Sequence, residues 1–265
     1  MSRFAPVAPI HILARLKQYG ILGRYHLLLA HDVAAHPLEF GEVFFSHDNW
    51  NGGYIIMDNS LIELGEAADV SVVRTACSVV RPNVVVLPDK LMDTNWTVTH
   101  SIMAHDDWDK IGIIGRQGFM GVVQGTTWNE CLICAHELTK LRKVTALAIP
   151  RVLTEKTEIQ SRLGLAITLH KRYPEYTLHL LGFSDNTFDD LLTASLPFVS
   201  GIDSAVPLRI AITDGLAVSM SGEGFELLNR IGPRRGFWDD MNHNNDRALI
   251  HNLNVIRQYI GHVDL

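Results

Sequence analysis

Short apolar runs that alternate with stretches of helical spacing restrict the fold of this sequence more than any other feature. Runs begin near residues 25, 54, 83, 119, 146, 177 and 198, which is one every ~20–35 residues, as in chains built from β/α repeats. The runs are almost entirely apolar, as expected for strands of a parallel sheet that is buried on both faces. Strands and helices in alternation imply right-handed crossovers, and therefore an α/β fold.

The boundaries of these elements follow from apolar spacing and from turn residues. Strands are expected at Tyr25–Ala30, Tyr54–Met57, Asn83–Leu87, Phe119–Val123, Ala146–Ile149, Thr177–Leu181 and around Phe198–Ile202. Helices are expected at Ile10–Gly20, Ala67–Val80, Thr94–Asp107, Trp128–Lys143, Glu158–Tyr173 and Phe188–Leu196. A loop is expected between residues 31 and 53, because it contains Pro37, Gly41, Gly52 and Gly53.

Seven strands in 265 residues predict a single-domain (β/α)8 TIM-type barrel. The eighth strand is expected near Val7–Ile12 or after Arg209. An open doubly wound sheet is the alternative, although no Gly-x-Gly-x-x-Gly follows the first strand. No linker divides residues 1–265: the β/α repeats are clear over 24–210, and a helical tail is expected within 238–262.

Composition narrows the environment and the partners. The chain is 47% hydrophobic and 20% charged, with a net charge of −6, so no strong basic field indicates nucleic-acid binding. No leader peptide and no run of ~18 apolar residues is present, so no membrane contact is expected. Three cysteines do not form a disulfide framework, which favours a cytoplasmic setting. Cys131 and Cys134 fall within a helical apolar pattern and predict a packed helix face.

Polar side chains follow several of the expected strands. In a barrel these positions share one mouth, where chemistry takes place. The residues are Asp58, Asp89, Gln124, Arg151 and Asp203. Two carboxylates on either side of a reactive carbon suit glycosidic chemistry, and an Asp with a Gln can read the edge of a purine. For each residue alone, a turn or helix cap is the alternative.

Several stretches resemble motifs of the tRNA-guanine transglycosylase superfamily, in the family order. These are (β/α)8 enzymes that exchange a guanine base for a 7-deazaguanine. Gly121–Gly125 is similar to the family's Gly-Ile-Val-Gln-Gly, and Asp203–Arg209 keeps the spacing of its Asp-Cys-Val-Leu-Pro-Thr-Arg. The other similar stretches are Tyr25–Leu29, Asp58–Ser60, Val86–Asp89, His179–Gly182 and His251–Leu253.

The sequence departs from that family at four places. Glu63 replaces a Gln of the family, and Ala148–Arg151 replaces its Gly-Gly-Leu-Ala strand end. Ser60–Leu61 replaces a Gly-Gly pair, and no cysteine follows Cys134, so the family's structural zinc subdomain is not expected. A compact, zinc-free chain is most similar to phage-type enzymes that insert 7-deazaguanines into DNA. The resemblance therefore implies DNA as the preferred substrate, tRNA as the alternative, and 7-cyano-7-deazaguanine (preQ0) as the incoming base, within a host cytoplasm.

The resemblance also implies roles for individual residues. Asp203 would attack C1′ of the target nucleoside and form a covalent glycosyl–aspartate, while Asp58 would exchange protons with the bases. The base would be bound by Asp89, Gln124, Gly125, Gly182 and Pro150. The nucleic-acid backbone would be bound by Arg209, Arg234 and Arg235. Neither a cofactor nor a metal is expected, and the oligomeric state is left open.

Two other classes of function remain open from the sequence. One is a metal-dependent barrel hydrolase that would use His31, Asp58 and Asp203. The other is a non-catalytic partner subunit, which the presence of both Asp58 and Asp203 disfavours.

Overall fold

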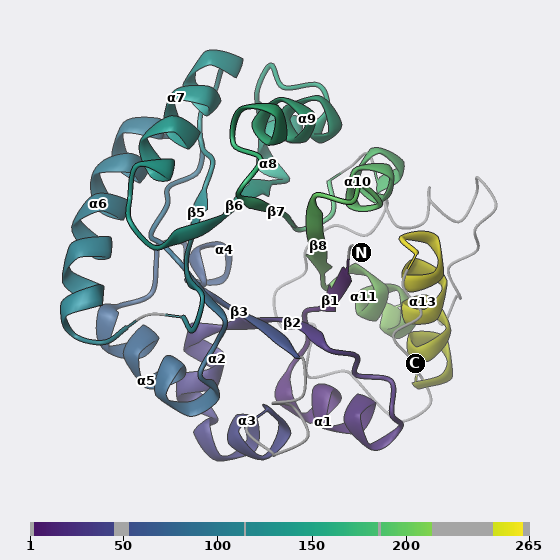
Figure 1. Ribbon diagram of the computed structural model, residues 1–265. Coiled ribbons are helices and arrows are strands. Elements are labelled where there is room, and N and C mark those ends of the chain that lie inside the picture. Colours follow the sequence, from purple (N-terminus) through teal and green to yellow (C-terminus); the bar gives the residue numbers. More distant parts are fainter. Residues whose placement is uncertain (1–2, 45–52, 114, 185–186, 214–245, 262–265) are drawn as a thin grey trace.

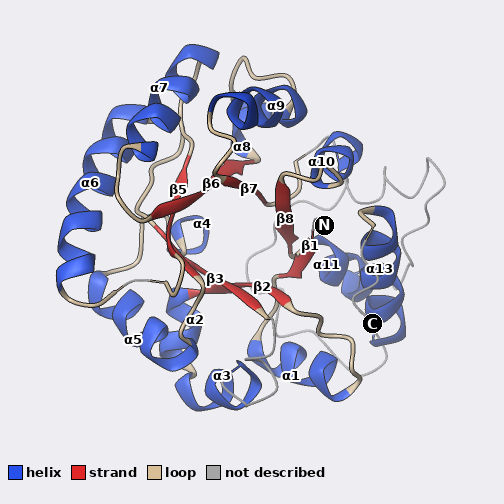
Figure 2. Ribbon diagram, in the orientation of Figure 1, coloured by secondary structure: helices blue, strands red, loops and turns tan. Residues whose placement is uncertain are grey.

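A computed structural model describes residues 3–44, 53–113, 115–184, 187–213 and 246–261. Eight strands surround the centre of the molecule, and helices form a ring outside them (Figures 1 and 2). The strands are β1 (Arg3–Pro6), β2 (Tyr25–Leu29), β3 (Tyr54–Asp58), β4 (Val84–Val86), β5 (Gly118–Val122), β6 (Val144–Pro150), β7 (Thr177–Leu181) and β8 (Val199–Ser204).

The strands form one parallel sheet in the order β1-β8-β7-β6-β5-β4-β3-β2. Its two edge strands, β1 and β2, lie side by side (Figure 1), so the sheet is a nearly closed barrel. The predicted single-domain (β/α)8 fold is confirmed. All eight strands run in the same direction, so their carboxyl ends meet at one mouth of the barrel and their amino ends at the other.

The helices follow the strands along the chain. They are α1 (Ile10–Gln18), α2 (Ala30–Ala35), α3 (Pro37–Phe44), α4 (Leu61–Leu64), α5 (Val70–Val80), α6 (Thr94–Lys110), α7 (Trp128–Thr139), α8 (Val152–Lys156), α9 (Arg162–Arg172), α10 (Thr187–Ala194), α11 (Val206–Thr213) and α13 (Asp246–Tyr259). Local sequence fixes several of their starts: Asp93 caps α6, and Thr127 with Glu130 forms a capping box at α7.

Side chains of the strands divide between two cores. One core lies between the strands and the outer helices, and the smaller one fills the barrel interior. The interior core contains Ala5, Tyr25, Leu27, Ile56, Val84, Val86, Met120, Val122, Ala146 and Ala148. Successive strand residues face opposite sides of a sheet, so Asp58, two residues after Ile56, occupies an inward-facing position.

The eighth strand is not where the sequence analysis expected it. It is β1, at Arg3–Pro6, and it pairs with β8 from Arg3 opposite Gly201 to Pro6 opposite Ser204. The Val7–Ile12 segment instead leads into α1, and residues after Arg209 continue α11. β1 is only four residues long and ends at a proline, so it carries too little apolar periodicity to be recognised.

The expected loop between residues 31 and 53 is wrong for its first half, which forms α2 and α3. Pro37 is the first residue of α3, where its missing N–H removes no helical hydrogen bond. Gly41 lies inside α3 with no atom near the position of an added Cβ. In this segment the proline therefore begins a helix and the glycine lies inside it, so neither residue indicates a loop.

The carboxyl-terminal helix α13 packs next to α11 (Figure 1). Asn252 donates to the Pro207 carbonyl at 3.1 Å, and Arg257 donates to the carbonyls of Ile21 and Leu22 at 2.7 and 2.9 Å. The first bond attaches α13 to α11, and the two bonds of Arg257 attach it to the loop before β2. None of the helices in the described ranges has the length and apolar character needed to cross a membrane.

Candidate active site

The carboxyl-end mouth of the barrel collects the acidic side chains that the sequence placed at strand ends. Asp58 is the last residue of β3, Asp203 is near the end of β8, and Asp89 follows β4. Glu63 joins them from α4, the short helix that appears within the ring of strands in Figure 1. Each of these carboxyl groups interacts electrostatically with at least one of the others.

Asp203 is held by two donors from the neighbouring strand. Its Oδ1 lies 3.0 Å from Nε2 of His179 and accepts a hydrogen bond from the Gly182 backbone N–H at 3.1 Å. The side chain is 11% exposed. Asp203 does not cap the next helix, because Ser204 Oγ accepts from the Val206 N–H at the start of α11. No described residue donates to Oδ2 of Asp203, which leaves that oxygen for a ligand.

Asp58 has a different environment. Barrel atoms packed around this half-buried carboxyl group raise its pKa well above the ordinary value. Glu63, Asp89 and Asp203 raise that pKa further, and only the Ser60 N–H, which donates to Asp58 Oδ2 at 2.7 Å, opposes them. Asp58 thus forms the local turn expected of a strand-end Asp, and its surroundings favour the protonated form of its carboxyl group.

Glu63 extends the acidic cluster to the solvent-exposed rim. Protein atoms packed around one side of its carboxyl group raise its pKa, and Asp203 and Asp32 raise it further. His31 opposes them. The sequence analysis did not select Glu63 as a site residue, because it lies in a four-residue helix rather than at the end of a strand.

Asp89 and Gln124 bind each other. Asp89 accepts from Asn59 Nδ2 at 2.8 Å and from Gln124 Nε2 at 2.7 Å, while Gln124 Oε1 accepts from the Met92 N–H at 2.9 Å. Burial raises the pKa of Asp89 to about 6, although both side-chain hydrogen bonds lower it. These contacts connect the ends of β3, β4 and β5, and they occupy atoms that were expected to read a base.

The remaining residues expected to bind a base lie at the same mouth. Their places there are explained by backbone packing and backbone conformation. Gly125 packs against the start of α7, since an added Cβ would lie 2.8 Å from Cys131 N. Pro150 is the buried last residue of β6. Gly182 has φ +70°, a conformation that favours glycine, and its N–H reaches Asp203.

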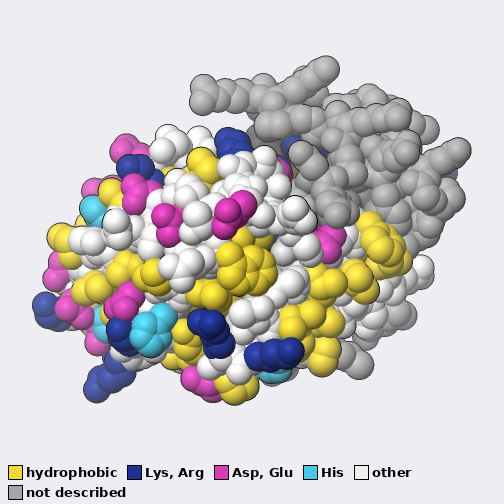
Figure 3. Space-filling view, turned by 90° about the horizontal axis from the view of Figure 1, so that it is seen from above, with side chains coloured by type: hydrophobic (Ala, Val, Ile, Leu, Met, Phe, Trp, Pro, Cys, Tyr) yellow, Lys and Arg dark blue, Asp and Glu magenta, His cyan; other side chains and the backbone are white. Residues whose placement is uncertain are grey.

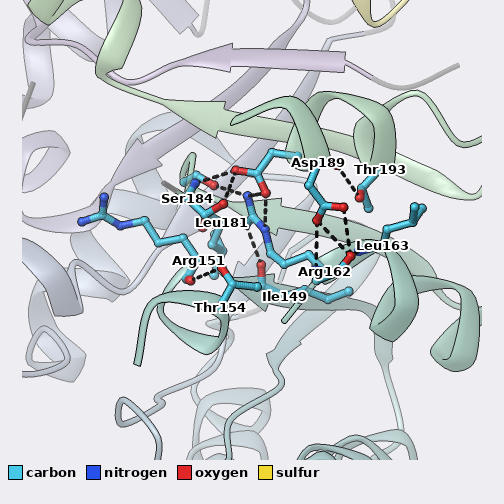
Figure 4. Close-up of polar contacts among 12 residues, drawn as sticks. Ile149, Arg151, Thr154, Arg162, Leu163, Leu181, Ser184, Asp189 and Thr193 are labelled. Carbon is cyan, nitrogen blue, oxygen red and sulfur yellow. Dashed lines mark hydrogen bonds and ion pairs between the residues drawn. The ribbon is translucent and has the colours of Figure 1, made fainter. Parts of the chain in front are cut away.

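A buried arginine that the sequence analysis did not select fixes this end of the barrel. Arg162 is 0% exposed and lies between the ends of β6 and β7 (Figure 4). It donates to the carbonyls of Ile149, Leu181 and Gly182 at 3.2, 3.2 and 2.7 Å, and its Nε donates to Asp190 at 2.7 Å. The peptide group between Leu181 and Gly182 is therefore held on both sides: its N–H donates to Asp203, and its carbonyl accepts from Arg162.

Cations near the mouth are few in the described part of the chain. Arg209 lies in α11, and burial and then the nearby Arg151 lower its pKa. Arg151 also lies 3.8 Å from Glu155. Arg234 and Arg235 lie outside the described residues. On the flank shown in Figure 3, basic and acidic side chains are interspersed over the described residues.

The described residues do not support the metal-dependent alternative. No group of three or more His, Cys, Asp or Glu side chains suited to a metal ion is present among them. His31 lies 3.2 Å from Asp32 rather than in a set with Asp58 and Asp203. Cys131 and Cys134 are buried in α7, where burial raises the pKa of both thiols to about 12. The predicted packed helix face is what the structure shows.

Comparison with known proteins gives the class of fold. No family model matches the chain, and no curated protein sequence matches it. Among solved structures it is similar to (β/α)8 enzymes at low sequence identity.

One of these is D-psicose 3-epimerase, solved in the presence of D-fructose, with 12% identity and a TM-score of 0.55 over 99% of this chain and 100% of the other. Another is the YdjI aldolase of Escherichia coli K12, with 11% identity and a TM-score of 0.47 over 97% and 90% of the two chains. At such identities the likeness shows the fold alone.

The expected membership of the tRNA-guanine transglycosylase superfamily, and the base-exchange function with it, is wrong. No family model supports it, and a solved structure similar to the chain is that of a sugar epimerase. Short polar motifs at strand ends do not identify a family, because (β/α)8 enzymes of many functions gather polar residues there. The nucleic-acid and 7-deazaguanine partners were implied by that resemblance and have no support beyond it.

Proposed function

We propose that this protein is an enzyme that moves protons to and from a small polar substrate bound at the carboxyl-end mouth of the barrel. The observation that carries the proposal is the environment of Asp58, a carboxyl group with a strongly raised pKa beside Asp203. A carboxyl group whose protonated form is favoured by its surroundings is suited to general acid catalysis. Asp203, with Oδ2 unoccupied by described donors, is suited to accept a proton.

The reaction class that fits this pair is isomerisation next to a carbonyl group. Asp203 takes a proton from the carbon next to the carbonyl while Asp58 donates its proton to the carbonyl oxygen, which gives an enediol. Asp203 then returns a proton to carbon and Asp58 takes one back from a hydroxyl oxygen, so both carboxyl groups end as they began. Atoms balance without a redox partner, because one proton leaves the substrate and one returns. The fold neighbour named as an epimerase of D-psicose, solved with D-fructose, makes ketohexoses the first substrate class to test.

Deuterium exchange tests the proposal directly. The protein is incubated in D2O with each member of a panel of ketohexoses, and NMR follows deuterium entering the carbon positions next to the carbonyl. We expect incorporation with the wild type and a loss of about 100-fold or more in the separate variants Asp203→Asn and Asp58→Asn.

The matched control is Asp107→Asn, which makes the same chemical change at a side chain that is 72% exposed on α6. Its exchange rate should equal that of the wild type. Exchange that persisted in Asp203→Asn and Asp58→Asn would remove these residues from the acid and base roles. An absence of exchange from the whole panel, with the protein folded, would reject the proposed substrate class.

A further inference from the structure

A chain of hydrogen-bonded side chains passes through the barrel interior, starting at Asp203. His179 Nε2 lies 3.0 Å from Asp203, and His179 Nδ1 lies 2.8 Å from the hydroxyl of Tyr25. That hydroxyl lies 3.1 Å from Ser200 Oγ, which donates to the Leu178 carbonyl at 2.8 Å. β2, β7 and β8 each contribute to the chain, so it crosses the interior rather than following one strand.

The far end of the chain reaches a cavity at the amino-end mouth. This cavity has a volume of about 340 Å³, and both Tyr25 and Ser200 line it. Its other lining residues come from the starts of strands or the segments before them, and include Arg3, Tyr54, Tyr176 and Phe198. Chemistry in such barrels takes place at the opposite mouth, so this cavity is separate from the candidate active site.

The sequence makes room for the Tyr25 ring at Gly201. A Cβ at residue 201 would lie 2.6 Å from Tyr25 Cε1, and Gly201 is opposite His179 in the pairing of β7 with β8. Tyr25 also stacks on Tyr54, with ring centroids 5.4 Å apart. Tyr25 is 2% exposed and His179 is 0% exposed. The hydrogen-bonded series of side chains is therefore enclosed by protein everywhere except at its two ends.

The donor-to-acceptor direction of the hydrogen bonds in this series of side chains depends on one proton. With Asp203 ionised, His179 Nε2–H donates to Asp203, and Tyr25 donates to Nδ1. A proton that reaches Ser200 Oγ shifts the series: Ser200 passes its proton to Tyr25, Tyr25 to Nδ1, and Nε2 to Asp203. Afterwards Asp203 is protonated, Nδ1–H donates to Tyr25, Tyr25 donates to Ser200, and Ser200 donates to the Leu178 carbonyl. Every side chain retains a hydrogen bond in both states.

We propose that Ser200, Tyr25 and His179 form a proton path that connects Asp203 to water in the cavity at the amino-end mouth. The path rests on the proposed function, because it supplies the proton acceptor of that reaction. It lets Asp203 exchange its proton with solvent on the side away from the substrate, so the active-site mouth can remain closed to bulk water. Tyr25 and His179 act through Asp203 and are positioning residues, not catalytic ones.

The charges around the path are consistent with transfer by neutral groups. Burial raises the pKa of Tyr25 well above its ordinary value, and Tyr54 and Asp203 add to this, while Ser200 and Arg3 oppose it. Tyr25 therefore relays a proton as a phenol, without becoming a phenolate. At the other end, Asp203 faces Asp58 and Glu63, which interact with it electrostatically.

The first test reads the His179 ring and needs no substrate. The 13 histidines are labelled with 15N in the ring, and the His179 signals are assigned by their loss in His179→Gln. We expect the ring proton on Nε2 while Asp203 is ionised and on Nδ1 once Asp203 is protonated, so the position of the ring proton should follow the state of Asp203. In Tyr25→Phe, Nδ1–H has no acceptor, so Nδ1 should stay unprotonated over the range in which the wild type changes.

The matched control is Tyr54→Phe, which removes a hydroxyl from the same cavity but outside the path; its His179 signals should follow the wild type. Ser200→Ala, a smaller change at the cavity end, should shift Nδ1 protonation in the same direction as Tyr25→Phe. A proton on Nδ1 at every pH, or the same behaviour in the wild type, Tyr25→Phe and Ser200→Ala, would overturn the path.

The second test uses the deuterium exchange reaction. Tyr25→Phe should lower turnover on the order of 10-fold with KM unchanged, less than removal of the acid or base itself. Tyr54→Phe should leave both constants unchanged. Equal turnover in Tyr25→Phe and the wild type would overturn the path. If the wild type exchanges no substrate, the proposed function fails, while the His179 signals still decide whether the path exists.

Discussion

At the scale of single residues, Asp58 shows the conflict between catalysis and stability that is typical of active sites. Its pKa is raised by loss of water and by neighbouring carboxyl groups, so ionisation of Asp58 destabilises the folded protein. A carboxyl group with a raised folded-state pKa contributes stability below its unfolded pKa. That contribution is lost as the pH rises through the folded pKa.

Replacement of Asp58 by Asn should therefore stabilise the protein at high pH while abolishing exchange. The amide has the shape of the protonated acid, and its oxygen can still accept from the Ser60 N–H. We expect a gain in the free energy of unfolding on the order of 1 kcal/mol at pH 8 and a smaller gain at pH 4, measured by urea denaturation. A gain that was independent of pH, or shared by Asp107→Asn, would contradict this explanation.

At the scale of secondary-structure elements, the long buried strands and amphipathic helices could be predicted from the sequence because apolar spacing alone defines them. The expected helix at 94–107 corresponds to α6, and the expected strand at 177–181 corresponds to β7. β1 and α3 could not be predicted in the same way. The first has four residues that depend on pairing with β8, and the second contains a proline and a glycine that usually indicate loops.

Arg162 shows how an element can depend on one side chain. It joins α9 to the ends of β6 and β7 and forms an ion pair with Asp190, with both side chains 0% exposed. Removal of one partner of a buried ion pair leaves the other charge without compensation. Arg162→Met should lower the free energy of unfolding by about 3–5 kcal/mol, measured by urea denaturation.

Two further variants separate the ion pair from the packing of the helix. Arg172→Met, at the exposed end of the same helix, should leave stability nearly unchanged. The double variant Arg162→Met with Asp190→Leu should lose less than the sum of its single changes, because no charge is left unpaired. Additive losses would indicate that Arg162 acts through its carbonyl contacts alone.

At the scale of the whole molecule, the sequence predicted the barrel and the mouth at which Asp58, Asp89, Gln124 and Asp203 meet, because parallel strands bring their carboxyl ends together. It did not predict which of these atoms remain for a ligand. Asp89 and Gln124 bind each other across two strand ends, and the partners of Asp203 come from a different strand. Such pairings depend on the register between strands, which short motifs do not contain.

The acid sensitivity of the whole molecule should depend on His26, a buried residue of β2 near Arg257. Burial lowers the pKa of His26 to about 3, and the nearby Arg257 lowers it further, while a backbone hydrogen bond with Gly23 opposes them. A histidine with a depressed folded-state pKa contributes stability above its unfolded pKa, ~6.5. That contribution declines as the pH falls towards the folded value.

Replacement of His26 by Gln, which stays neutral, should flatten this decline. Between pH 5.5 and 4.5 the wild type should lose about 1 kcal/mol more of its free energy of unfolding than His26→Gln, since each pH unit within the window corresponds to about 1.4 kcal/mol per proton. The control is His36→Gln, whose side chain is 54% exposed and whose pH profile should match the wild type. Parallel profiles for His26→Gln and the wild type would mean that other groups cause the acid sensitivity. A flatter profile would show that the neutral state of one buried ring limits how far the barrel tolerates acid, because protonation there places a second positive charge beside Arg257.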